Sequence, residues 1–143
     1  MLVEGLQTAL ANDAGLQSFI GTPSTRSDKT TGIFPLVAPE QVPMPYVVMQ
    51  QVSGSPVSSM EGTNRLTLTR WRFSCYGTTY KQAKQLARAL KMAMISLNGP
   101  LPSGNAVIMG SWAVMETDDL EVVPHATIYT VHSDFNINYI DNE

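Results

Sequence analysis

The sequence predicts an α+β domain, with a mostly antiparallel (mixed) sheet of about four to five strands and with one long helix and an N-terminal helix packed on it. Two observations support this class. Apolar residues recur at helical spacing between Thr79 and Leu97, as on the buried face of an amphipathic helix. Strand-like segments occur in pairs before and after that helix, and consecutive strands are usually neighbours in a sheet.

The most informative strand is predicted from Arg65 to Tyr76, a segment rich in β-branched and aromatic residues. Its apolar residues change parity, because Leu66 and Leu68 are even-numbered whereas Trp71, Phe73 and Cys75 are odd-numbered. Strict alternation keeps one parity. We therefore expect either a bulge near Thr69–Arg70 or a strand that is covered on both faces.

The helix after this strand has clear start and stop signals. Thr79 and Gln82 have the spacing of a capping box, which satisfies free backbone donors of the first turn. Asn98, Gly99 and Pro100 end the helix, because glycine adopts a left-handed cap and proline does not continue a helix. The apolar stripe between these signals consists of Ala83, Leu86, Ala87, Leu90, Met94 and Leu97.

The N-terminal part is predicted to begin with an amphipathic helix that carries Leu2, Leu6 and Leu10. Asp13 can cap a second short turn. A polar, mobile loop follows at about 21–32, and a second loop is expected at about 53–64.

The remaining strands are expected on either side of these features. Ile33–Pro35 can pair briefly as an edge strand, and Tyr46–Val52 is the first clear strand. Ala106–Met115 and Ala126–Tyr139 follow the long helix, and they are joined by an acidic turn at 116–121. We assign residues 1–143 to one domain, since the length suits one and no repeat is visible.

Composition excludes several classes of function. The net charge is −3, so nucleic-acid binding through bulk charge is not expected. No apolar run approaches the roughly 20 residues that span a bilayer. Only 15% of the residues are charged, below the roughly 25% of typical soluble domains, which suggests a surface covered by another chain. The single cysteine allows no internal disulfide and favours a reducing compartment.

We find no pattern that predicts catalysis or a cofactor. Cys75 with His125 or His132 as a base would be a possible nucleophilic pair, but a cysteine in an apolar strand usually packs as a small hydrophobic residue. The acidic residues of 116–121 match no calcium loop, and no two histidines lie one helical turn apart. We therefore predict a protein without catalytic, cofactor or metal sites.

Charged residues indicate possible contacts between subunits. The long helix carries four basic residues on one side with no acid among them. This stripe is either a solvated face or a contact with an acidic surface of a second copy. The candidate contact residues are Lys81, Lys84, Arg88 and Lys91 on the helix, Glu116, Asp118, Asp119 and Glu121 in the acidic turn, and Met60 and Glu61 in the second loop.

The order of these segments resembles the tail-completion, or tail-terminator, proteins of long-tailed bacteriophages and prophages. The resemblance covers nearly the whole chain and rests on the order of several segments. These are Asp13–Leu16–Phe19–Gly21, Pro45–Val48, Gln51–Gly54, Trp71–Gly77 and the helix beginning Tyr80–Ala83.

The resemblance implies a structural virion protein without catalytic residues. Such proteins form a ring, generally a hexamer, on the head-proximal end of the tail tube. The implied partners are further copies of the chain, the tail tube protein and the head connector, with no sequence-specific nucleic acid and no membrane. The implied location is the virion, and the host cytoplasm during assembly. The alternatives are a stopper or adaptor of the head–tail connector, or a small cytoplasmic enzyme or ligand-binding domain that uses Cys75.

Overall fold

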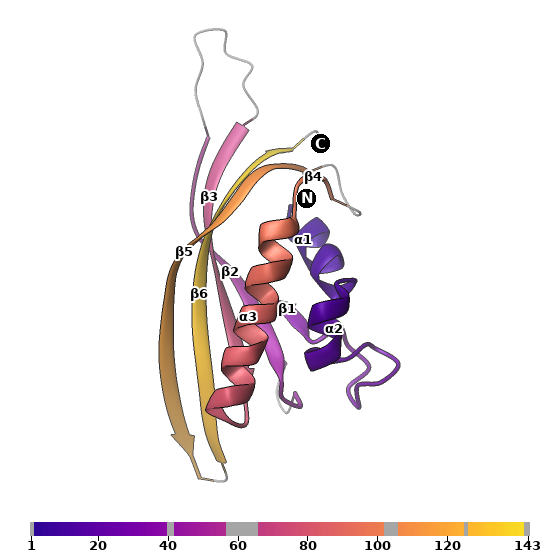
Figure 1. The fold of residues 1–143 in the computed structure, drawn as a ribbon, viewed down its shortest axis with the longest axis vertical. Helices are drawn as coiled ribbons and strands as arrows, with labels where there is room; N and C mark the ends of the chain where they lie inside the picture. Colours follow the sequence, from indigo (N-terminus) through magenta and orange to yellow (C-terminus); the bar gives the residue numbers. More distant parts are fainter. Residues whose placement is uncertain (1, 40–41, 57–65, 102–105, 125, 142–143) are drawn as a thin grey trace, which may run out of the picture.

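The protein folds as one six-stranded sheet with helices packed on one face (Figure 1). The computed structural model describes residues 2–39, 42–56, 66–101, 106–124 and 126–141. The sheet order is β1-β2-β3-β6-β5-β4. The elements are α1 (Leu2–Ala11), α2 (Ala14–Ile20), β1 (Ile33–Pro35), β2 (Tyr46–Pro56), β3 (Leu66–Gly77), α3 (Tyr80–Ser96), β4 (Gly99–Pro100), β5 (Ala106–Val123) and β6 (Ala126–Asp141).

The predicted α+β class is confirmed, but the element count is corrected. The prediction of four to five strands and one long helix with an N-terminal helix becomes, among the described residues, six strands and three helices. The extra strand β4 has two residues, and the extra helix α2 has seven. Elements of this length show too little periodicity to be distinguished from turns. The single domain over residues 1–143 stays a prediction.

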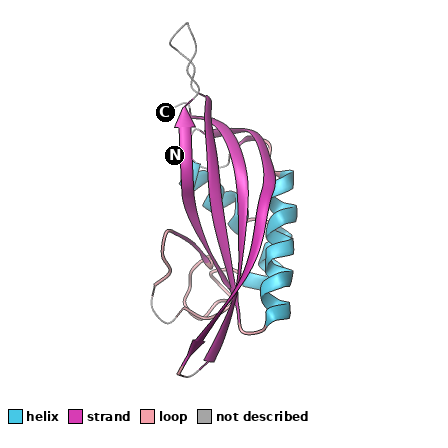
Figure 2. Cartoon of the chain, turned by 90° about the vertical axis from the view of Figure 1, so that its left-hand side faces the viewer, coloured by secondary structure: helices cyan, strands magenta, loops and turns pink. Residues whose placement is uncertain are grey.

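The sheet is antiparallel except at one edge. β1 pairs with β2 in parallel, whereas the remaining neighbours are antiparallel. Figure 2 shows the strands in front of the helices, so that one face of the sheet packs on helices and the other carries none. We call these the helix face and the open face. Odd-numbered residues of β3, including Trp71, Phe73 and Cys75, are buried on the helix face.

The expected bulge in β3 is wrong. β3 pairs with β6 without a shift of register, and the irregularity lies in β2 between Gln51 and Ser53, opposite Trp71 and Arg70. Full coverage of both faces is also wrong, because Leu68 is exposed. The parity change therefore reflects an apolar residue placed on the open face and not a change in the backbone.

Helix α3 forms as its capping residues predict. The Thr79 hydroxyl accepts a hydrogen bond from the Gln82 N–H at 3.1 Å, while the Gln82 side chain accepts one from the Thr78 N–H at 2.8 Å. The reciprocal contact thus reaches one residue further back than in a standard capping box. Gly99 has φ of 84°, a left-handed conformation that suits glycine after a helix end. The buried stripe packs on the sheet and includes Leu86, Leu90 and Met94.

The predicted acidic turn at 116–121 is wrong, because these residues continue strand β5. They pair with β6 in register from Glu116 opposite Ser133 to Glu121 opposite Ile128. Acidic residues are uncommon in strands, so the local sequence favoured a turn. Pairing with a long neighbouring strand overrides that preference. Residues 53–56 likewise belong to β2, and the rest of the second predicted loop, with Met60 and Glu61, lies outside the described residues.

Candidate interaction surfaces

Lys84 contacts the acidic residues of its own chain. Its ammonium lies 3.1 Å from Glu116 Oε2 and 2.7 Å from Asp118 Oδ1, and the Tyr80 hydroxyl donates to Asp118 at 2.6 Å. The hydrogen bond from Lys84, and then that from Tyr80, lowers the pKa of Asp118. These groups fasten α3 to β5. Of the predicted contact residues, Lys84, Glu116 and Asp118 therefore have partners within the chain.

The other predicted contact residues that the structure describes remain exposed. Lys81, Arg88 and Lys91 have no acidic partner within 4.0 Å among the described residues. Glu121 likewise has no basic partner in the part of the chain that the structure covers, and Asp119 lies 3.8 Å from a ring nitrogen of His132. The structure thus divides the described members of the predicted set into a group with partners inside the chain and an exposed group without an ionic partner at hydrogen-bond distance.

A groove lies between α2 and α3, and sequence reasoning did not identify it. Its volume is about 480 Å³, and its walls include Phe19 from α2 and Arg88 and Met92 from α3. The Phe19 and Met92 side chains are exposed. The groove is set by the packing of two helices from separate parts of the chain. The local signal was an apolar residue, Met92, outside the predicted stripe.

The open face of the sheet carries a cluster around one buried acid. Asp134 is only 2% exposed, and it accepts hydrogen bonds from Arg70 and Arg72 on β3 at 2.8 and 2.9 Å. Burial raises the pKa of Asp134, but the hydrogen bonds from Arg72 and Arg70 outweigh it and hold that pKa below its usual range. The cluster joins β3 to β6 by charge-assisted hydrogen bonds. In the sequence, the signal for this cluster was that Arg70, Arg72 and Asp134 all stand at even-numbered positions of predicted strands.

We expect Asp134→Asn to lower the free energy of unfolding by about 1–2 kcal/mol, since both arginines lose a charged partner but reach solvent. The contribution of Asp134 is full above the ordinary carboxyl pKa and declines as pH falls through its lowered value. The variant should therefore lose less stability than the wild type on acidification. Urea titration at pH 7 and at pH 3 measures both effects, with Asp119→Asn as the exposed control. Equal stability of Asp134→Asn and wild type at pH 7 would contradict the assigned role.

The geometry does not support the alternative of a nucleophilic Cys75. The thiol is fully buried, and burial raises its pKa strongly. His132 lies on the open face, where its Nδ1 contacts the Ser74 hydroxyl at 2.8 Å. Cys75 and His132 thus point to opposite faces of the sheet. His125, the other proposed base, lies outside the described residues.

The Ser74–His132 pair itself also lacks the setting of a hydrolase. Asp119 is 3.8 Å from the second ring nitrogen, beyond hydrogen-bond distance. Ser74 lies within β3, flanked by β2 and β6. Among the described residues no group of His, Cys, Asp and Glu is arranged to hold a metal, and no helix in that part of the chain is long and apolar enough to cross a membrane.

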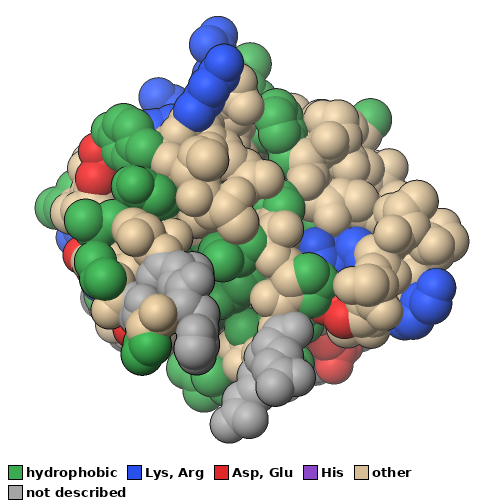
Figure 3. All heavy atoms as spheres, turned by 90° about the horizontal axis from the view of Figure 1, so that it is seen from below, with side chains coloured by type: hydrophobic (Ala, Val, Ile, Leu, Met, Phe, Trp, Pro, Cys, Tyr) green, Lys and Arg blue, Asp and Glu red, His purple; other side chains and the backbone are tan. Residues whose placement is uncertain are grey.

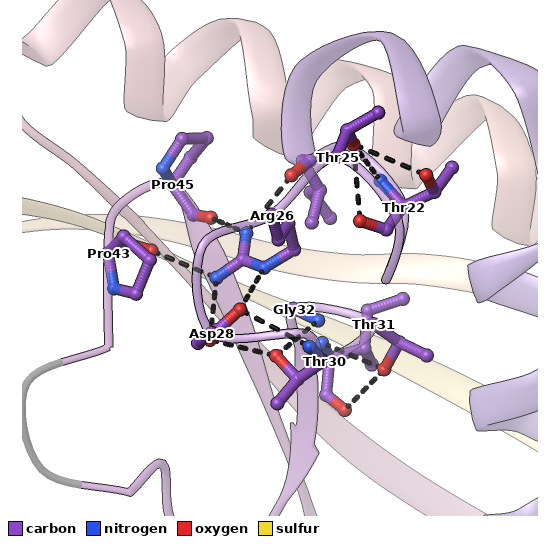
Figure 4. A network of polar contacts seen from close by, with 11 residues as sticks. Thr22, Thr25, Arg26, Asp28, Thr30, Thr31, Gly32, Pro43 and Pro45 are labelled. Carbon is purple, nitrogen blue, oxygen red and sulfur yellow. Dashed lines mark hydrogen bonds and ion pairs between the residues drawn. The ribbon is translucent and has the colours of Figure 1, made fainter.

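Arg26 organises the segment that was predicted as a mobile loop (Figure 4). Its guanidinium donates to the carbonyls of Ile20, Pro43 and Pro45 at 2.9–3.0 Å, and it pairs with Asp28 at 3.0 Å. The hydrogen bond from Arg26 is the main reason that the pKa of Asp28 falls to about 2. Arg26 itself is nearly buried. One side chain thus ties the end of α2 to the segment that leads into β2.

The described surfaces comprise an apolar groove, exposed charges on α3 and β5, and two internally satisfied ionic clusters. Tail completion protein gp17 is the family whose model matches, over residues 4–121, and the chain belongs to this family of bacteriophage proteins. The resemblance inferred from the sequence is thereby confirmed. A search of curated proteins finds no match.

Among solved structures, the fold is similar to a chain in a structure described as "Virion of native gene transfer agent (GTA) particle". The TM-score is 0.63, the identity is 18%, and the match covers 96% of each chain. At this identity the similarity shows a shared fold. The family match ends within β5, so the structural match is what extends the comparison over β6.

Proposed function

We propose that this protein caps the head-proximal end of a phage tail tube as a ring, ends tube polymerisation and offers the docking surface for the head connector. Membership in the tail completion family over residues 4–121 is the observation that carries this proposal. The partners are further copies of the chain, the tail tube protein and the connector. The protein acts in the virion, after assembly in the host cytoplasm.

Polymerisation control is the proposed mechanism. One face of the ring copies the docking geometry of a tube subunit, whereas the other face does not, so no further tube subunit is added. Such a role needs distinct contact surfaces and no chemical step. The exposed charges on α3 and on β5 lie on different elements, as the two patches of a head-to-tail contact must, and their opposite signs suit such a contact.

Removal of the coding sequence from the phage or prophage genome tests this function directly. We expect tails of uncontrolled length that are not joined to heads, visible by negative-stain microscopy, and restoration by the wild-type protein supplied from a plasmid. Tails of normal length without heads would instead assign the protein to a stopper or adaptor of the connector. Normal, infectious particles would contradict both roles.

The solution mass gives an independent check on ring formation. Light scattering over a concentration series, with images of any large species, is expected to show a discrete closed oligomer. A monomer that assembles only when tail tubes are added would also agree with capping, since the tube end then nucleates the ring. A monomer in the presence of tubes as well would contradict the ring.

A further inference from the structure

The tip of the β5–β6 hairpin extends beyond the rest of the sheet. β3 ends at Gly77, opposite Tyr129, whereas β5 and β6 continue to pair beyond this point. Figure 1 shows the hairpin passing the lower end of α3. A ribbon of two strands has only marginal stability in water by itself. A contacting surface would therefore stabilise this tip.

The tip combines apolar and acidic side chains. Leu120 and Val122 are 55% and 75% exposed. They alternate with Asp119 and Glu121, and successive residues of a strand point to opposite faces. Seen from this end of the molecule, hydrophobic side chains reach the surface with acidic ones beside them (Figure 3). On β5, Leu120 and Val122 thus form an apolar pair on one face of the ribbon, and Asp119 and Glu121 form an acidic pair on the other.

The α2–α3 groove has the complementary chemistry. Phe19 and Met92 supply exposed apolar walls, and Arg88 supplies a positive charge with no acidic partner among the described residues. The acid in the wall, Asp13, is engaged as the cap of α2, where it accepts a hydrogen bond from the Leu16 N–H at 3.0 Å.

We propose that the hairpin tip of one copy docks into the α2–α3 groove of the next copy. Leu120 and Val122 then pack on Phe19 and Met92, and Glu121 lies beside Arg88. A groove contacts both faces of an inserted ribbon, so the apolar and the acidic face are bound together. The inference rests on the proposed function in one respect, because that function requires copies of the chain to associate.

The positions of the two surfaces make this a head-to-tail contact. Figure 1 places the hairpin and α2 on opposite sides of α3, so the chain's own tip does not occupy its own groove. A contact between two different patches of the same chain repeats by rotation and generates a ring when the rotation closes. The charges set the orientation of the tip and oppose its docking against other acidic surfaces.

A charge exchange tests the contact. Glu121→Lys and Arg88→Glu should each weaken self-association at least about tenfold, as expected for a close charge pair, and the two changes combined in one chain should restore most of it. Lys29→Glu and Glu4→Lys are matched controls, because both side chains are exposed on other segments. Self-association is measured by light scattering. If the free chain is monomeric, the same variants are compared for assembly in the presence of tail tubes. Equal melting temperatures show that the variants fold.

A cysteine pair tests the geometry independently. Met92→Cys and Val122→Cys in one chain should form covalent oligomers under mild oxidation, and the buried Cys75 should stay unreacted. A mixture of the two single variants should give dimers only. Val37→Cys with Val122→Cys is the control pair, since Val37 is at least as exposed as Met92 but lies outside the groove.

The outcomes separate this inference from the proposed function. One outcome is a closed oligomer in which the cysteine pair does not crosslink and the charge exchange does not change association. This outcome overturns the contact and leaves the capping role intact. Groove variants that associate normally but lose binding to tail tubes would show that the groove holds the tube protein, which also overturns the contact. A chain that stays monomeric on tubes as well contradicts both.

Discussion

Replacement of Arg26 with methionine is expected to lower the free energy of unfolding by about 2–4 kcal/mol. Arg26 is 7% exposed, and its guanidinium donates to three backbone carbonyls. Methionine fills a similar volume but donates nothing, so one buried and two partly buried acceptors lose their partner. For a chain of this size the change corresponds to a fall of roughly 6–12 °C in melting temperature, measurable by scanning calorimetry.

The same variant should change the response to acid. The pKa of Asp28 is about 2, below its usual 3.8, chiefly because of the hydrogen bond from Arg26. A lowered pKa in the folded state contributes stability that is present above about pH 4 and is lost as the pH falls toward 2. The difference in stability between wild type and Arg26→Met should therefore shrink over this interval. Urea titrations at pH 7, 4 and 2.5 measure it.

Lys29→Met is the matched control for this prediction. Lys29 is an exposed cation close to Arg26 in sequence, so its loss should change stability by less than about 0.5 kcal/mol. Arg26→Lys should recover only part of the loss, because an ammonium does not reproduce the planar fork of the guanidinium. An Arg26→Met protein that melts with the wild type would show that the network does not stabilise the fold.

Gly77→Ala is expected to lower the free energy of unfolding by about 2–3 kcal/mol, because the corner between β3 and α3 has no room for a side chain. A Cβ at this position would lie 2.8 Å from the backbone nitrogen of Ala83 and 3.2 Å from the Thr79 carbonyl oxygen. Both atoms belong to the first turn of α3 or its cap, so relief of the overlap moves the helix. Chemical denaturation followed by circular dichroism measures the loss.

Gly110→Ala provides the control for Gly77→Ala. Gly110 lies in β5, and an added Cβ would meet only the Trp112 side chain at 3.5 Å, an ordinary contact. Its stability should stay close to that of the wild type. If Gly77→Ala and Gly110→Ala behaved alike, the close approach of β3 and α3 would not be a constraint on the sequence at residue 77.

The sequence by itself determined the limits of those helices whose start and stop signals each lie within a few neighbouring residues. The limits of α3 follow from Thr79, Gln82 and Gly99, because capping and left-handed turns depend on residues within a few positions of each other. The Asp13 cap of α2 is of the same kind. The order of such segments was also sufficient to indicate the family.

Only the tertiary structure decided which charges are paired within the chain. Lys84 and Arg88 were equivalent in the sequence, but Lys84 meets Glu116 and Asp118 of β5, whereas Arg88 lines a groove against α2. The tertiary structure also decided the conformation of the acidic segment 116–121, which is a strand because β6 pairs with it. These outcomes depend on contacts between distant parts of the chain, and the free energy of such contacts exceeds the local preferences that a sequence displays.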